Sequence, residues 1–272
     1  MLEYVFMQKA LITGIVLAIA LPCIGVTVVL KHLSMTGDAL SHCSLAGVAG
    51  GLVAGINPVV GSLVACLVAS LGIEAIRKRV PRFADTSIAV VSAAGLGLAG
   101  VLSGFTGNSS NLNSFLFGSI ISVSTEEVVA VCILGVLTIA FAFIFRRPLL
   151  CLALDEGIAR TSGTRTGLVN VGFAIAVSIV IAVSARTIGA LIVSSMLVIP
   201  VVCALQSAKS YHALVIHAVV FALVSTLIGI TMSYYFGLKP GGTIILIEAA
   251  ILIVLLVAKG VSGRVSVARQ AR

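Results

Sequence analysis

Apolar runs long enough to cross a membrane recur along this 272-residue chain, and no other feature restricts its fold as strongly. A helix needs about 20 mainly apolar residues to span the hydrocarbon core of a bilayer. Nine such spans are predicted, at residues 10–30, 39–56, 58–76, 86–104, 127–145, 168–185, 187–205, 212–236 and 243–258. The runs are apolar on every side, whereas strands of a transmembrane barrel alternate apolar and polar residues. We therefore expect an all-α, polytopic transmembrane helical bundle that forms a single domain over residues 1–272.

Composition supports the same class. Hydrophobic residues make up 60% of the chain and charged residues only 10%, whereas a soluble protein has about 25% charged residues. This shortage of polar side chains excludes a soluble globular fold, so the bilayer is the expected solvent.

Two of the predicted span boundaries fall inside longer apolar stretches. Asn57-Pro58 divides residues 39–76, and residues 184–187 divide residues 168–205. The first run could instead be a secretory signal peptide, but such an apolar region is about 7 to 15 residues long. Residues 10–30 exceed that length and end at Lys31-His32, so we expect a retained span.

The distribution of basic residues predicts an orientation, because cytoplasmic loops carry the excess of Lys and Arg. With the C-terminus in the cytoplasm and nine spans, the N-terminus lies outside. Fourteen basic residues then lie inside and three, Lys9, Arg186 and Lys239, lie outside. The formal net charge of +8 is therefore explained by topology, and we expect no nucleic acid partner.

The chain lacks sequence motifs that other membrane proteins use for catalysis. It has no G-x-x-x-x-G-K-[ST] loop for ATP and no H-E-x-x-H motif for an intramembrane metalloprotease. Ser262 lies in a Gly-Val-Ser-Gly turn, but no His follows it. We therefore expect a transport protein rather than an enzyme, with no cofactor of its own.

Asp38 and His42, at the start of the second predicted span, form the main candidate site. Residues four apart lie on one face of a helix, and ionisable groups within spans are costly and tend to be functional. A carboxylate and an imidazole are typical ligands of Zn²⁺ and other first-row cations. Alternatively, the helix dipole stabilises Asp38 and His42 is merely hydrogen-bonded; spacing alone leaves both open.

Structural roles are expected for most other polar residues. Glu74 should pair with Arg77 or Lys78, and His212 and His217 should lie at an interface or pack. Glu248 is either satisfied by a neighbouring helix or a proton carrier. Glycines at four-residue spacing should allow close helix packing, and the six cysteines should pack without disulfides. The glycines are Gly47, Gly51, Gly55, Gly100 and Gly104; the cysteines are Cys23, Cys43, Cys66, Cys132, Cys151 and Cys203.

Residues 37–42 (GDALSH), followed by residues 45–49, resemble the signature of the membrane subunits of bacterial ABC importers for zinc, manganese and iron. Further agreement comes from residues 112–120, 155–163, 188–200 and 239–244, so the resemblance follows the order of nearly the whole chain. One departure is Ala46, where family members often have Pro; we interpret the Ala form as favouring zinc.

This resemblance implies a permease, homodimeric or paired, with a separate ABC ATPase subunit and an extracellular metal-binding protein as partners, in a bacterial plasma membrane. It implies that Asp38 and His42 contact the metal in the translocation path, and that a two-fold axis between two permease chains could bring two such pairs together. It also implies that Asp155, Ala159 and Gly163 belong to an inner loop that contacts the ATPase. An ordinary cytoplasmic linker is the alternative for that loop.

We therefore expect ATP-driven uptake of a divalent transition metal by alternating access, with zinc as the preferred ion and manganese or iron as alternatives. Two other classes of function remain as alternatives. An ion-coupled secondary transporter would use Glu248 as proton carrier, and a structural membrane partner would leave Asp38 without a role.

Overall fold

A computed structural model describes residues 4–80, 84–106, 124–154 and 166–270, together with Gly157 and Ala159. These ranges are helical and contain no strand, which confirms the all-α prediction. The helices are α1 (Val5–Leu30), α2 (Thr36–Val53), α3 (Pro58–Arg79), α4 (Ala84–Thr106), α6 (Thr125–Ile144), α7 (Arg146–Leu154), α9 (Thr166–Ile188), α10 (Ala190–Leu205), α11 (Tyr211–Phe236) and α12 (Pro240–Gln270).

The predicted count of nine spans is not confirmed, although each of the nine runs forms a helix. Within the described ranges, seven helices are long and apolar enough to cross a membrane: α1, α3, α4, α6, α9, α11 and α12. The other two predicted spans are α2, with 18 residues, and α10, with 16. At 1.5 Å per residue they extend over about 27 Å and about 24 Å, less than the hydrocarbon thickness of about 30 Å.

Of the two span boundaries predicted inside longer apolar stretches, one is confirmed and the other is wrong. Asn57 caps α3 by accepting a hydrogen bond from the Val59 amide, and Pro58 occupies the first turn, where its missing amide proton costs nothing. Residues 184–187, in contrast, belong to α9. The helix is interrupted at Gly189, between the end of α9 and the start of α10. Gly189 has φ 103°, a conformation that disfavours any side chain.

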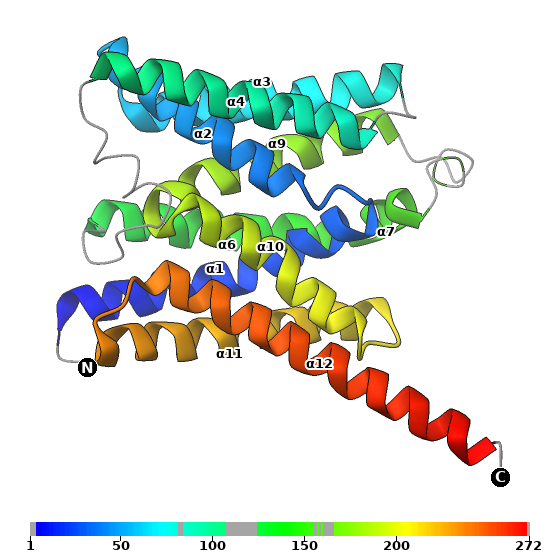
Figure 1. Cartoon of the computed structure of the whole chain (residues 1–272). Coiled ribbons are helices and arrows are strands. Elements are labelled where there is room, and N and C mark those ends of the chain that lie inside the picture. Colours follow the sequence, from blue (N-terminus) through cyan, green and yellow to red (C-terminus); the bar gives the residue numbers. More distant parts are fainter. Residues whose placement is uncertain are drawn as a thin grey trace.

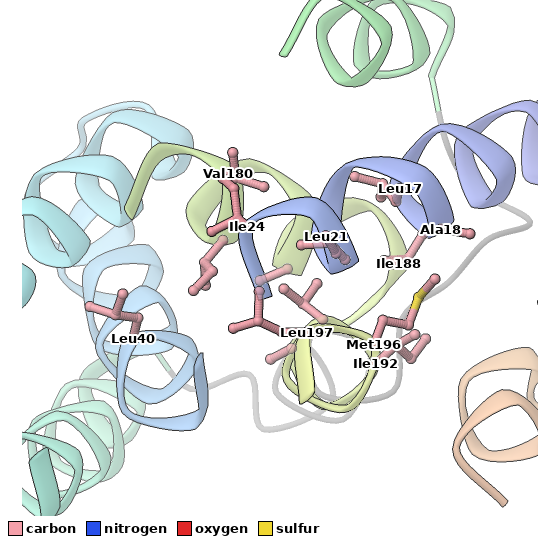
Figure 2. Close-up of a cluster of buried hydrophobic side chains, with 14 of the residues drawn as sticks. Leu17, Ala18, Leu21, Ile24, Leu40, Val180, Ile188, Ile192, Met196 and Leu197 are labelled. Atoms are coloured by element: carbon pink, nitrogen blue, oxygen red, sulfur yellow. The ribbon is translucent and has the colours of Figure 1, made fainter. Parts of the chain in front are cut away.

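The helices form three groups in Figure 1: α2, α3 and α4 lie together, α11 and α12 lie together, and α1, α6, α9 and α10 lie between them. The main core is at the junction of α1, α9 and α10 (Figure 2). Leu21 and Ile24 of α1, Ile188 of α9 and Leu197 of α10 are buried there, and Leu40 of α2 belongs to the same cluster.

The glycines on α2 pack closely, but those on α4 do not. A Cβ on Gly47 would collide with the carbonyl oxygen of Gly61 in α3, and a Cβ on Gly61 would collide with that of Gly47. Gly51 is also tight against Pro58, whereas Gly55 has φ 67° in the turn after α2. The packing prediction is therefore confirmed on α2 except at Gly55. It is not borne out for Gly100 and Gly104, where a Cβ would meet no atom of the described residues within 4 Å.

Counting α2 and α10 with the seven long helices, successive helices that cross the bundle run in opposite directions, so the basic helix termini gather at one end of the bundle (Figure 1). Two contacts show this directly. Lys259 near the end of α12 donates to Gln206 at the end of α10, and Arg146 after α6 contacts His212 at the start of α11. The six cysteines are all free, as expected.

Candidate metal site

Asp38 and His42 lie together on α2. His42 Nε2 is 3.4 Å from Asp38 Oδ2, and the side chains are 19% and 35% exposed, respectively. The four-residue spacing therefore produces the expected pair on one helix face. Their ability to bind a metal stays a prediction. The chemistry suits it, because imidazole nitrogen and carboxylate oxygen are both ligands of first-row divalent cations.

The imidazole of His42 keeps one nitrogen unpaired. Its Nδ1 is buried and has no hydrogen-bond partner among the described residues. A buried polar atom without a partner is costly, and metal-bound histidines normally use their second nitrogen for a hydrogen bond that fixes the ring. In the described part of the chain, His42 therefore leaves one nitrogen open to a ligand, to a residue outside the described ranges or to another chain.

Ser41, between the two candidate ligands, fixes the position of α2 against α10. Its hydroxyl lies 2.8 Å from the Gly37 carbonyl oxygen and 3.2 Å from the Ala190 carbonyl oxygen at the start of α10. Gly37 itself faces Leu197, where a Cβ would lie 2.9 Å from the Leu197 Cδ2 atom. The segment carrying the pair is thus held against the break at Gly189.

One chain provides only part of a metal shell. The described residues contain no group of three or more His, Cys, Asp or Glu side chains placed to hold an ion. Zinc sites usually have three or four protein ligands. If Asp38 and His42 bind a metal, the remaining ligands come from water, from residues outside the described ranges or from another chain.

The residues expected to contact an ATPase are only partly visible. Ala159 is helical and fully buried, while Asp155 and Gly163 lie outside the described residues. Their proposed role stays a prediction.

The remaining ionisable candidates have structural partners. Glu74 accepts two hydrogen bonds from Arg77 and lies 3.6 Å from Lys78 Nζ, which confirms the predicted pairing. Glu74 is also buried, and the guanidinium of Arg77, 3.0 Å from its carboxylate, balances its charge. Glu248 contacts Ser225 on α11 through Oε1, as expected of an acid that pairs with a neighbouring helix.

The two histidines of α11 pack against neighbouring segments, which is one of the two expected roles. His212 Nε2 lies 3.1 Å from Arg146 Nη1, and His217 Nδ1 lies 3.0 Å from the Ser207 hydroxyl. Both contacts join α11 to a neighbouring segment.

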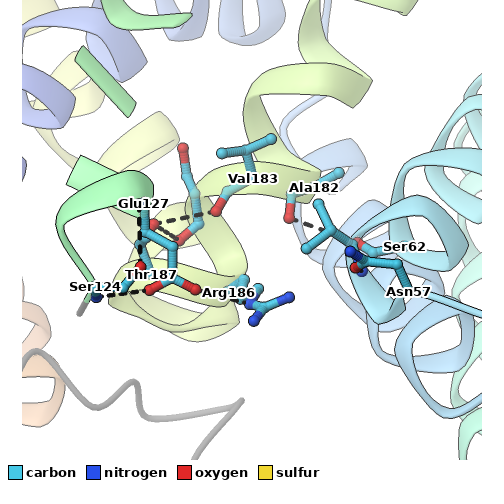
Figure 3. A network of polar contacts seen from close by, with 10 residues as sticks. Asn57, Ser62, Ser124, Glu127, Ala182, Val183, Arg186 and Thr187 are labelled. Carbon is cyan, nitrogen blue, oxygen red and sulfur yellow. Dashed lines mark hydrogen bonds and ion pairs between the residues drawn. The ribbon is translucent and has the colours of Figure 1, made fainter. Parts of the chain in front are cut away.

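A polar network at the opposite end of the bundle from the basic termini was not anticipated (Figure 3). Ser124 and Glu127 form a capping box at the start of α6, and Glu127 also pairs with Arg186 of α9 at 3.0 Å. These residues border a cavity of about 530 Å³ together with the Asn57-Pro58 turn. The S-x-x-E spacing is a recognisable helix-start signal and could have predicted the cap, whereas the ion pair depends on tertiary structure.

The described residues form a helical bundle with long apolar helices and a partly exposed Asp–His pair on α2, and sequence comparison identifies the family of the chain. The ABC 3 transport family matches residues 3–259, so the chain belongs to that family. Together with the seven apolar helices, this makes it a multi-pass membrane protein.

Three characterised or named relatives cover nearly the whole chain. The probable metal transport system membrane protein of Treponema pallidum is 31% identical over 94% of this chain and 96% of its own length. The manganese transport system membrane protein MntC of Listeria innocua is 29% identical over 93% of this chain and 91% of its own length. The high-affinity zinc uptake system membrane protein ZnuB of Haemophilus influenzae is 26% identical over 94% of this chain and 98% of its own length.

Solved structures show the same architecture. PsaBC from Streptococcus pneumoniae in complex with Fab superposes with a TM-score of 0.82 at 27% identity, covering 93% of this chain and 91% of that chain. A putative metal-chelate type ABC transporter in an inward-facing conformation gives a TM-score of 0.71 at 16% identity, which supports the fold alone. The predicted ABC-importer permease type is thereby confirmed.

Proposed function

We propose that this chain is the permease subunit of an ATP-driven importer of divalent transition metals in a bacterial plasma membrane. The observation that carries the proposal is the Asp38–His42 pair, with 3.4 Å between its closest atoms. Family membership supports transport, and relatives named for manganese, iron and zinc support a metal as cargo.

A homodimer explains how an incomplete site could serve transport. Asp38 and His42 are partly exposed on a single chain, and an ionisable pair on the surface of a membrane bundle needs polar surroundings. A two-fold axis next to α2 would place two pairs together and supply four ligands, the usual number for zinc. Two ligands from each chain hold the ion during passage and release it when the chains move apart.

Alternating access follows from this arrangement. An extracellular metal-binding protein delivers the ion, Asp38 and His42 coordinate it transiently, and ATP hydrolysis on a separate subunit resets the bundle. The basic end of the bundle faces the cytoplasm, with the C-terminus, because cytoplasmic segments carry the excess of Lys and Arg. In this orientation the loop containing Asp155, Ala159 and Gly163 meets the ATPase.

Zinc is the preferred ion, although the carboxylate and imidazole ligands suit manganese and iron as well. Competition between Zn²⁺, Mn²⁺ and Fe²⁺ decides the cargo. Metal content is measured in cells that produce the complete transporter and in cells lacking this subunit. Selective loss of zinc accumulation without the subunit supports the proposal, and unchanged content of all three metals contradicts it.

Coupling to the ATPase has its own test. A variant with residues 155–163 scrambled should reach the membrane and fold, yet lose metal-stimulated ATP hydrolysis by the assembled transporter. A variant with a scrambled stretch beyond Lys259 serves as the control. Retained stimulation after scrambling residues 155–163 would count against the assignment of this loop.

A further inference from the structure

Glu248 is a second ionisable residue inside the bundle, separate from the Asp38–His42 pair. It lies within the apolar part of α12, between Pro240 and Lys259, and is only 2% exposed. α12 packs against α10 and α11. Glu248 Oε1 lies 3.4 Å from the Ser225 hydroxyl on α11, and Oε2 has no hydrogen-bond partner among the described residues.

The two hydroxyl groups near Glu248 each have a backbone carbonyl oxygen as acceptor at 3.0 Å. Ser225 Oγ lies 3.0 Å from the Ala222 carbonyl oxygen, closer than its 3.4 Å contact with Glu248. Ser195, the other hydroxyl beside the carboxyl group, donates to the Ile192 carbonyl oxygen at 3.0 Å. A serine hydroxyl has one proton to donate and two lone pairs that accept. Each serine can give its one proton to a backbone carbonyl oxygen, which leaves its lone pairs free to accept a hydrogen bond from a protonated Glu248.

Among the described residues of α10, α11 and α12, no cation lies close enough to balance a charge on Glu248. α10 contains no Lys, Arg or His, and its titratable group near the carboxyl is the thiol of Cys203. On α11, His217 lies about 12 Å along the helix axis from Ser225. On the α12 segment, Lys239 and Lys259 lie about 13 Å and about 16 Å along the axis from Glu248. An isolated carboxylate in such surroundings would be costly, whereas a neutral carboxyl group is not.

We propose that Glu248 is a proton-binding site within the membrane: its carboxyl group keeps its proton and donates it to Ser225, which ties α12 to α11. This neutral group acts as donor and acceptor at once and matches neighbours that offer lone pairs. It distinguishes Glu248 from a proton carrier, which must exchange its proton with water during transport.

Infrared spectroscopy of the full-length protein in lipid nanodiscs tests the protonation state. The wild-type protein should show the C=O stretching band of a protonated carboxyl group at neutral pH, where an ordinary Glu side chain is ionised. Glu248→Gln should abolish the band. Glu126→Gln, a matched change at an exposed acid at the start of α6, should leave it unchanged.

Two further measurements keep the proposal open to refutation. If Glu248→Gln does not fold, Glu248→Asp should retain the band at a shifted frequency; an unshifted band would assign it to another residue. A folded Glu248→Gln variant should retain metal uptake within about twofold, because the amide also donates and accepts. Absence of the band from wild-type protein at neutral pH, or lost uptake in that folded variant, would overturn the proposal.

Discussion

Replacing Gly47 by Ala should separate α2 from α3 and destabilise the bundle. The added Cβ would lie 2.7 Å from both the Ala65 Cβ and the Ser62 Cα atoms, whereas carbon atoms in contact prefer about 3.5 to 4.0 Å. Relief of this overlap requires the helices to move apart by about 1 Å.

The cost of this movement has three parts. Inserting a methyl group into a packed interface costs about 1 to 3 kcal/mol. The buried Ser44–Ser62 hydrogen bond, now 2.7 Å long, would lengthen beyond hydrogen-bonding range, at a cost of about 0.5 to 1.5 kcal/mol. The higher helix propensity of Ala offsets about 1 kcal/mol. Gly47→Ala should therefore lower the free energy of unfolding by about 1 to 3 kcal/mol.

Reversible unfolding in mixed detergent micelles measures this difference. Gly100→Ala on α4 is the matched control, because a Cβ there meets nothing within 4 Å. The control should be as stable as the wild type or more stable by up to about 1 kcal/mol. Equal stability of the two variants would refute the packing argument.

Three further substitutions test other parts of the fold. Gly189→Ala forces a side chain into a conformation with φ 103° and should cost about 1 to 3 kcal/mol in the same unfolding assay; an unchanged midpoint would contradict strain at this break. Ser124→Ala removes the cap of α6 and should cost about 1 kcal/mol, with faster hydrogen exchange at the Glu127 amide; unchanged exchange would argue against the cap. Arg186→Gln should cost less than about 1 kcal/mol because the Glu127 pair is partly exposed, and a larger loss would indicate a further role.

Apolar length and helix-start chemistry made much of the fold predictable. The runs of about twenty residues identified the helices, and Asn57-Pro58 marked a boundary through local chemistry that operates in any fold. Gly189 was missed because a glycine within an apolar run can be helical or left-handed, and only the packing of α9 against α10 selects the second.

Side-chain partners were predictable where they are close in sequence. Asp38 and His42, and Glu74 and Arg77, are one helical turn apart, so their pairing follows from helix geometry. The Glu127–Arg186 pair joins distant segments, and the open surroundings of Gly100 depend on which helices neighbour α4. Spacing alone contains neither kind of information.

The most direct test of the account is ATP-driven metal uptake into proteoliposomes containing the complete transporter with Asp38→Asn or His42→Ala in this subunit. Glu126→Gln and His217→Ala are matched controls on other helices. If Asp38 and His42 coordinate the cargo, each site variant should fold yet lose at least about tenfold in uptake, while both controls transport normally. Normal uptake by both site variants would contradict the central claim.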